Sequence, residues 1–231
     1  MKTIGLIGGM SWESSLEYYR IINETVKQKL GHLHSCECIM YSVDFAEIEK
    51  LQHEEKWDVL TNKMTNFACK LETAGAELLV ICTNTMHNMV PEIQKNINTP
   101  ILHIADATAE EIKVNGIDKI GLLGTRFTME QDFYRGKLQE KHNIEVTIPL
   151  KSEREVIHNV IYQELINGVI KEESRTKFKQ IITNLQKRGA QGIILGCTEI
   201  PLLIKERDTD LPVFDTTLIH AKKAVEFALS L

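Results

Sequence analysis

Short apolar segments alternate along the chain with longer segments in which apolar residues recur every three or four positions. The short segments are typical of strands buried on both faces, and the longer ones of amphipathic helices. The pattern predicts strands at residues 3–7, 38–43, 77–82, 100–104, 119–123, 144–148, 192–196 and 212–214. It predicts helices at residues 16–30, 57–73, 107–114, 129–140, 153–170 and 174–188. Because strands that alternate with helices form parallel sheets covered by helices, the expected fold class is α/β.

Three apolar segments of the first half recur in the same order in the second half. The matching pairs are residues 4–8 and 120–124, residues 75–81 and 189–195, and residues 100–102 and 212–214, at offsets of 116, 114 and 112. Buried parallel strands resemble one another in composition, which is the alternative explanation, but the pairs Gly75-Ala76 and Gly189-Ala190 match as well. We therefore predict two related halves of about 115 residues, each with a parallel sheet of roughly four strands.

The turns after two of these equivalent strands carry the most reactive side chains. In open α/β sheets, ligands bind beyond the carboxyl ends of the strands. The offset of 114 aligns residues 83–85 (Thr-Asn-Thr) with residues 197–199 (Cys-Thr-Glu), and we expect both turns to face one cleft. Two groups on opposite faces of one carbon suit the inversion of a stereocentre.

Cys197 is the strongest candidate for a reactive group. It follows Gly196 at a strand end. The amino end of a following helix is expected to favour its thiolate. The alternative is a small buried hydrophobic residue, which is the role of most free cysteines. Its position alone does not decide between the two.

Composition and charge remove several classes of protein. With 43% apolar and 26% charged residues, the chain of 231 residues is typical of a globular protein. Its net charge of −5 gives no basic surface for nucleic acid, and no apolar run approaches the roughly 18 residues of a membrane span, so we expect a cytoplasmic location. The five cysteines form no Cys-x-x-Cys pair, which favours neither disulfides nor a zinc site. The glycines at 5, 8 and 9 do not have the spacing of a dinucleotide-binding loop.

Three motifs resemble signatures of the aspartate/glutamate racemase family, and most closely those of its broad-specificity amino-acid racemase branch. They are residues 8–11 (Gly-Gly-Met-Ser), 82–87 (Cys-Thr-Asn-Thr-Met-His) and 196–200 (Gly-Cys-Thr-Glu-Ile). The resemblance implies two similar Rossmann-like (flavodoxin-like) three-layer domains related by pseudo-twofold symmetry. It implies a first domain of residues 1–98 with residues 208–231 packing back onto it, a second domain of residues 99–207, and an active site in the cleft between them.

The resemblance also implies a reaction. Members of the family need no cofactor or metal, are often homodimers, and act on small amino acids with two cysteines. One cysteine removes the α-proton and the other returns a proton to the opposite face.

The sequence departs from the family at the first of these cysteines, where Thr83 stands. Cys82 lies one residue earlier, and alternation along a strand points it away from the cleft. A hydroxyl is a far weaker acid than a thiol, and therefore a poor general base near neutral pH. We expect Cys197 to abstract the proton and Thr83, or a water that it holds, to return one, with a preference for L-aspartate and L-glutamate.

Other polar positions are expected to hold the substrate. Charge that develops on its carboxylate needs preorganised donors, and the resemblance extends to residues that can line such a site. The candidate substrate-binding residues are Met10, Gln52, Asn84, Thr85, Thr125, Thr198 and Glu164. His87 could orient the substrate or Thr83, or cap its own helix, and His103 is a candidate hinge residue.

Two other functions remain open. A lone second cysteine also occurs in decarboxylases of the wider superfamily, which protonate an enediolate from one face. A two-lobed architecture can also serve as a binding or sensor module without catalysis.

Overall fold

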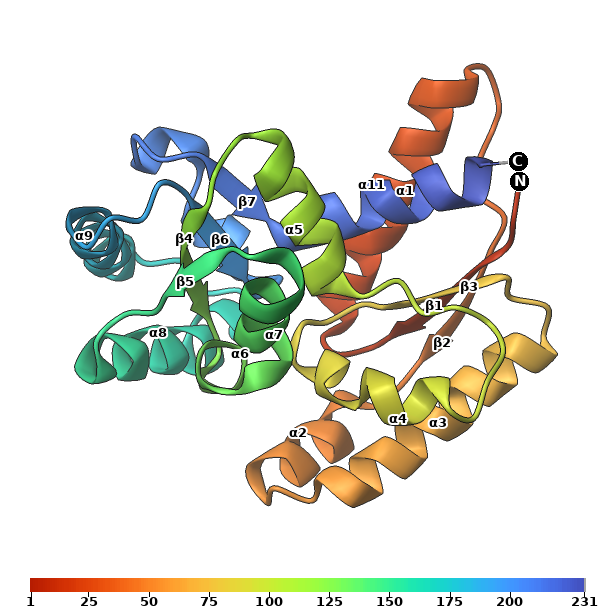
Figure 1. Ribbon diagram of the computed structural model, residues 1–231. Helices are drawn as coiled ribbons and strands as arrows, with labels where there is room; N and C mark the ends of the chain where they lie inside the picture. Colours follow the sequence, from red (N-terminus) through yellow and green to blue (C-terminus); the bar gives the residue numbers. More distant parts are fainter. Residues whose placement is uncertain (231) are drawn as a thin grey trace. The chain divides into compact units, whose positions relative to one another are not determined.

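Each half of the chain folds around its own parallel sheet in the computed structural model, which describes residues 1–230 (Figure 1). The first unit is Met1–His103 together with His220–Leu231, and the second is Ile104–Ile219. The predicted α/β fold class with parallel sheets is confirmed.

The sheet of the first unit has three strands in the order β2-β1-β3. The strands are β1 (Ile4–Gly8), β2 (Cys38–Ser42) and β3 (Leu78–Ile81). The strand expected at residues 100–104 is reduced to one parallel bridge between Ile101 and Leu79. It is short because helix α5 (Ile104–Val114) already begins at Ile104.

The sheet of the second unit has four strands in the order β5-β4-β6-β7. The strands are β4 (Lys119–Gly124), β5 (Glu145–Thr147), β6 (Ile193–Gly196) and β7 (Val213–Asp215). With the Ile101 bridge in the place of a fourth strand, the first sheet has the same order. The internal repeat of the sequence therefore corresponds to a repeated strand topology.

Close packing explains why glycine recurs in the central strand of each sheet. A Cβ atom added to Gly5 would lie 2.7 Å from the Cβ of Ala76, and one added to Gly121 would lie 2.7 Å from Cδ1 of Ile193. Only glycine therefore lets the central strand approach its neighbours this closely. Ala76, of the first Gly-Ala pair, makes the first of these contacts, and Ala190, of the second pair, lies 3.5 Å from the Cβ added to Gly121.

Helices cover both faces of the first sheet. The helices of this unit are α1 (Trp12–Leu30), α2 (Phe45–His53), α3 (Trp57–Thr73), the 3-10 helix η1 (Thr85–Met89), α4 (Val90–Gln94) and most of α11 (Thr216–Leu229). Figure 1 shows α1 and α11 on one side of β1 and β3, and α3 and α4 on the other. Each side has its own hydrophobic cluster, so the unit has three layers.

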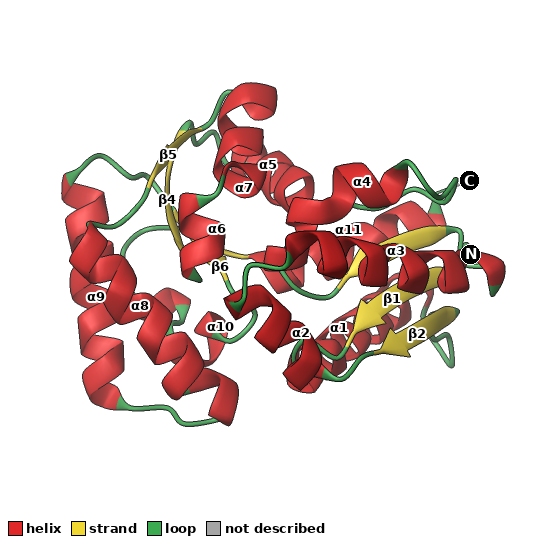
Figure 2. Cartoon of the chain, turned by 90° about the horizontal axis from the view of Figure 1, so that it is seen from below, coloured by secondary structure: helices red, strands yellow, loops and turns green. Residues whose placement is uncertain are grey.

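The second unit has the same kind of construction with shorter helices. Besides α5, its elements are α6 (Arg126–Glu130), α7 (Asp132–Gly136), the π-helix η2 (Lys137–Lys141), α8 (Lys151–Gln163), η3 (Leu165–Asn167), α9 (Glu172–Lys187), α10 (Ile200–Leu203) and η4 (Glu206–Asp208). The longest two, α8 and α9, run side by side (Figure 2).

Two predicted helices are wrong in extent. The segment 129–140 contains parts of three helices because Gln131 is extended, with φ −85° and ψ 152°, and ends α6. The segment 153–170 ends its α-helix at Gln163, and Gly168 takes a left-handed conformation.

The division of the chain differs from the expected residue limits. Residues 208–231 were expected to pack on the first domain, but β7 pairs with β6 and so belongs to the second unit. The chain returns to the first unit within α11, at His220. The rest of α11 packs Ala221, Ala224 and Val225 against the cluster under β1. Within residues 1–230, no helix is long and apolar enough to cross a membrane.

The loop from β1 to α1 depends on Gly9. Its φ is +91°, and an added Cβ would lie 2.3 Å from the carbonyl oxygen of Val43. Its N–H donates to the hydroxyl of Ser15 at 2.7 Å, and Ser11 caps α1 by accepting from the N–H of Ser14. The loop therefore has no room for a side chain at this position.

We predict that Gly9→Ala lowers the free energy of unfolding by at least about 2 kcal/mol more than Gly116→Ala does. Gly116 also has a positive φ, of 68°, but an added Cβ there meets no atom within 4 Å. The control therefore measures backbone strain alone, which costs about 1–2 kcal/mol. Urea unfolding of both variants gives the comparison, and equal losses would contradict the packing explanation.

Candidate active site

Equivalent turns follow β3 in the first unit and β6 in the second. After β3, residues 82–84 lead into η1, and after β6, residues 197–199 lead into α10. Both turns lie at the carboxyl end of a central pair of parallel strands, where α/β proteins bind ligands.

Side-chain alternation along β3 buries Cys82. Val80 and Cys82 belong to the cluster under α1 and α11, whereas Ile81 belongs to the cluster on the other face. Cys82 has no exposed surface, and burial raises the pKa of its thiol. Its thiol is therefore a protonated part of the core.

Thr83 is partly exposed, and its main chain is held from two sides. Its N–H donates to the carbonyl of Ile81 at 2.8 Å, and its carbonyl lies 2.8 Å from Nδ1 of His87. The hydroxyl of Ser14 donates to the carbonyl of Cys82 at 3.2 Å. These contacts fix the main chain of the turn, whereas Thr83 itself remains partly exposed; its role as a reactive residue stays a prediction.

Cys197 belongs to a small polar group with Thr198 and Glu199. The Cys197 thiol donates to Oε2 of Glu199 at 2.9 Å, and the Thr198 hydroxyl donates to the same oxygen at 2.7 Å. Cys197 is 8% exposed and Glu199 is 6% exposed. A thiol and a hydroxyl therefore share one carboxylate oxygen as acceptor in a site that is largely shielded from water.

The prediction that the Cys197 thiolate is favoured is wrong, because the surroundings favour the protonated thiol. Burial, followed by the negative charge of Glu199 and its hydrogen bond, raises the pKa of Cys197 well above its usual value. The backbone N–H groups of Thr198 and Glu199 lower it, as the helix argument requires, but their effect is smaller. The resting residue is a thiol at neutral pH.

Glu199 is the site residue whose role the sequence did not reveal. The Gly-Cys-Thr-Glu motif contains it, yet only the structure places its carboxylate against the thiol. A buried carboxylate at hydrogen-bond distance is positioned to accept the thiol proton.

The other candidate residues of the first unit are buried. Met10 follows β1, Gln52 lies on α2, and Asn84 and Thr85 begin η1. Met10 packs in one hydrophobic cluster with residues of α2 and η1. The structure therefore brings these three segments together.

The candidate residues of the second unit already have structural contacts. Thr125 caps α6, accepting from the N–H of Thr128 at 3.3 Å. Glu164 accepts from the Ser174 hydroxyl at 2.6 Å and from Lys171 at 3.2 Å, and these bonds, with that of Ser174 the stronger, lower its pKa. These contacts join the end of α8 to the start of α9, and a substrate role for Glu164 stays a prediction.

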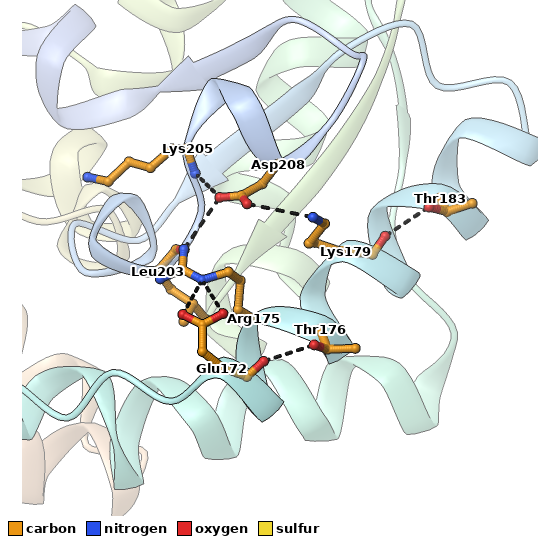
Figure 3. A network of polar contacts seen from close by, with 8 residues as sticks. All are labelled: Glu172, Arg175, Thr176, Lys179, Thr183, Leu203, Lys205 and Asp208. Atoms are coloured by element: carbon orange, nitrogen blue, oxygen red, sulfur yellow. Dashed lines mark hydrogen bonds and ion pairs between the residues drawn. The ribbon is translucent and has the colours of Figure 1, made fainter.

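A polar network holds the far end of α10, the helix that follows Cys197. Figure 3 shows Arg175 of α9 donating to the carbonyl of Leu203 and pairing with Glu172 and Asp208. Asp208 also accepts from the N–H of Lys205 at 2.9 Å. The network connects α10 and the turn after it to α9. Because α10 directly follows residues 197–199, the network also restrains that turn.

No group of three His, Cys, Asp or Glu side chains in the described part of the chain is placed to hold a metal ion. All five cysteines are free thiols.

Comparison with known proteins identifies the family. The model of the Asp/Glu/Hydantoin racemase family matches residues 7–224. The chain therefore belongs to this family, as its three motifs predicted, and it is an isomerase of the racemase class.

Individual relatives agree with this assignment. The broad specificity amino-acid racemase RacX of Bacillus subtilis is 23% identical over 239 residues, covering 98% of both chains. An Asp/Glu racemase family structure from Yersinia pestis is 55% identical with a TM-score of 0.94, and an aspartate racemase homologue from Pyrococcus horikoshii is 39% identical with a TM-score of 0.87. Both structures and this chain cover one another completely.

We predict that Glu199→Gln lowers the pKa of Cys197 by about one unit or more, because it removes the negative charge beside the thiol. The ultraviolet absorbance of the thiolate, measured against pH with Cys197→Ala as the blank, reports this titration. The control is Glu206→Gln, the same substitution on exposed η4. An unchanged titration in Glu199→Gln would show that burial alone raises the pKa.

Proposed function

We propose that the chain racemises amino acids without pyridoxal phosphate, with L-aspartate and L-glutamate as substrates and Cys197 as the general base. The observation that carries the proposal is the pair of equivalent strand-end turns. One turn has a thiol beside a carboxylate, and the other has a partly exposed hydroxyl. Family membership and the similarity to a broad-specificity racemase support the same chemistry.

In the proposed reaction the Cys197 thiolate removes the α-proton of the L enantiomer. The electron pair of the Cα–H bond then delocalises into the substrate carboxylate. Thr83, or a water bound to it, donates a proton to the opposite face of the planar carbon and recovers one from solvent. Glu199 accepts the thiol proton and so gives it a path to solvent. Each proton is therefore returned, and no oxidant or reductant is needed.

Substrate binding is assigned to the candidate residues that the sequence suggests; all but Met10 are polar, and Glu164, whose pKa is lowered, can only accept hydrogen bonds. The negative charge that develops on the substrate carboxylate is stabilised by preorganised donors. The proposed substrate-binding residues are Met10, Gln52, Asn84, Thr85, Thr125, Thr198 and Glu164.

The difference between a thiol and a hydroxyl makes the two half-reactions unequal. Enantiomers have equal free energies in solution, so the values of kcat/KM for racemisation in the two directions must be equal. The asymmetry must instead affect the exchange of the α-proton. A carbanion formed from the L enantiomer is reprotonated by Cys197 more readily than by Thr83, because the hydroxyl is the weaker acid. The L enantiomer therefore exchanges its α-proton many times for each inversion.

We predict that wild-type protein in D₂O, without added pyridoxal phosphate, exchanges the α-proton of L-aspartate at least about tenfold faster than it forms D-aspartate. D-aspartate should lose its α-proton only as fast as it is inverted. Proton NMR with a chiral assay of the product measures both rates. Cys197→Ala should abolish both, and the matched control Cys82→Ala should retain both, because that thiol is buried in the core.

Three outcomes would contradict the proposal. Equally fast exchange of both enantiomers would remove the asymmetry. Release of CO₂ from a malonate without α-proton exchange of amino acids would favour the single-cysteine decarboxylase. Binding of L-aspartate without any exchange would indicate a sensor module.

A further inference from the structure

Three histidines and a tyrosine form a buried aromatic cluster in the first unit. His87 lies with its ring centroid 4.8 Å from that of His103 and 5.4 Å from that of His220. Tyr18 meets His220 edge-on at 5.7 Å. The rings of His87, His220 and Tyr18 have no exposed surface, and His103 is also buried.

Hydrogen bonds determine which nitrogen of two of these rings carries the proton. A backbone carbonyl can only accept, so His87 must donate Nδ1–H to Thr83, at 2.8 Å. His220 must donate Nε2–H to the carbonyl of Leu102, at 2.9 Å. Its Nδ1 is then an acceptor, and the hydroxyl of Tyr18 donates to it at 2.8 Å. The cluster therefore has one consistent arrangement of protons.

Burial keeps the histidine rings neutral and so preserves this arrangement of protons. Burial is the main cause that lowers the pKa of His87 well below its usual value, and the neighbouring His103 lowers that pKa further. Burial and His87 likewise lower the pKa of His220 to about 3. Both rings are neutral at physiological pH, so each keeps one donor and one acceptor nitrogen.

The cluster lies where the chain leaves and re-enters the first unit. His103 is the last residue of its first segment, and His220 is the first residue of its second segment. Both pack against His87, and His87 bonds to the turn that carries Thr83. One buried ring therefore connects both chain crossings to the proposed proton-returning residue.

We infer that His87 is a positioning residue for Thr83: its Nδ1–H, oriented by the packed rings of His103 and His220, holds the carbonyl of Thr83 so that the hydroxyl can return a proton to the substrate. The inference rests on the proposed function. It assigns His87 to one half-reaction only, the protonation on the Thr83 face. Misplacement of a reacting group by about 1 Å costs about a hundredfold in rate, so loss of this hydrogen bond should slow inversion selectively.

Two substitutions separate the hydrogen bond from ring packing. His87→Phe keeps a flat ring between His103 and His220 but has no donor. His87→Asn loses the ring, but its amide nitrogen is the same number of bonds from Cα as Nδ1 and can donate to Thr83. We expect His87→Phe to reduce D-aspartate formation from L-aspartate by about tenfold to a hundredfold. Exchange of the L α-proton, which depends on Cys197, should stay within about threefold, and His87→Asn should recover most of the inversion rate.

The same NMR experiment distinguishes the possible failures. No α-proton exchange in the wild type would overturn the proposed function and the inference together. Exchange in the wild type with an unchanged ratio of exchange to inversion in His87→Phe would overturn the inference alone. If α-proton exchange and inversion fell equally in His87→Phe and in His87→Asn, the role of His87 would be merely structural, and the inference would be overturned.

A measurement on the wild type tests the inference without activity. Nitrogen-15 NMR of histidine-labelled protein at neutral pH should show His87 as the neutral Nδ1–H tautomer and His220 as the neutral Nε2–H tautomer. A charged or Nε2–H His87 would overturn the inference, even if a variant failed to fold.

Discussion

The alternation of side chains at the end of β3 determines which chemistry the first unit can offer. One face of this strand packs against α1 and α11, and the same face carries Cys82. The next residue, Thr83, is itself partly exposed. Because a shift of one residue exchanges the two faces, the thiol lies in the core and the hydroxyl of Thr83 is the group that we propose for the reaction. The turns after β3 and β6 are equivalent in position, but the first has a hydroxyl and the second a thiol at the matching residue.

The second unit contains the Cys197 thiol, which is a stronger acid than a hydroxyl. Its surroundings make the thiolate harder to form, because they raise the pKa of the thiol. Glu199 accepts from the Cys197 thiol and keeps it protonated. A resting thiol is a good proton donor, and a proton acceptor at 2.9 Å lets the thiol exchange its proton. The carboxylate thus raises the cost of forming the thiolate while it provides a path for the proton. The network around Arg175 and Asp208 holds α10 behind this turn.

Much of the fold could be predicted from the sequence because buried parallel strands and long amphipathic helices have distinct periods. The helix predicted at residues 57–73 matches α3 at both ends. Helices such as α6 and α10 are too short to show a period. The strand predicted at 100–104 has the composition of a strand but only one bridge, because the adjacent helix starts early.

The residues of the candidate site that lie within one motif could be predicted from the sequence. Contacts between residues far apart in the sequence could not. Alternation along the strand correctly predicts that Cys82 points into the core, and motif position makes Thr83 and Cys197 the candidates for the reaction. The direction in which the pKa of Cys197 shifts depends on where the Glu199 carboxylate lies, which no local sequence pattern reveals. The contact of His87 with His220 joins residues 133 positions apart, so no local pattern reveals it.

If the hydroxyl in place of a thiol at residue 83 makes the two half-reactions unequal, Thr83→Cys should make them nearly equal. With a thiol at each position, D- and L-aspartate should exchange their α-protons in D₂O at rates within about threefold of each other, and inversion should become faster. If the variant folds and keeps the wild-type excess of L exchange over D exchange, the identity of residue 83 does not cause the asymmetry, and the proposed roles of Thr83 and Cys197 are contradicted.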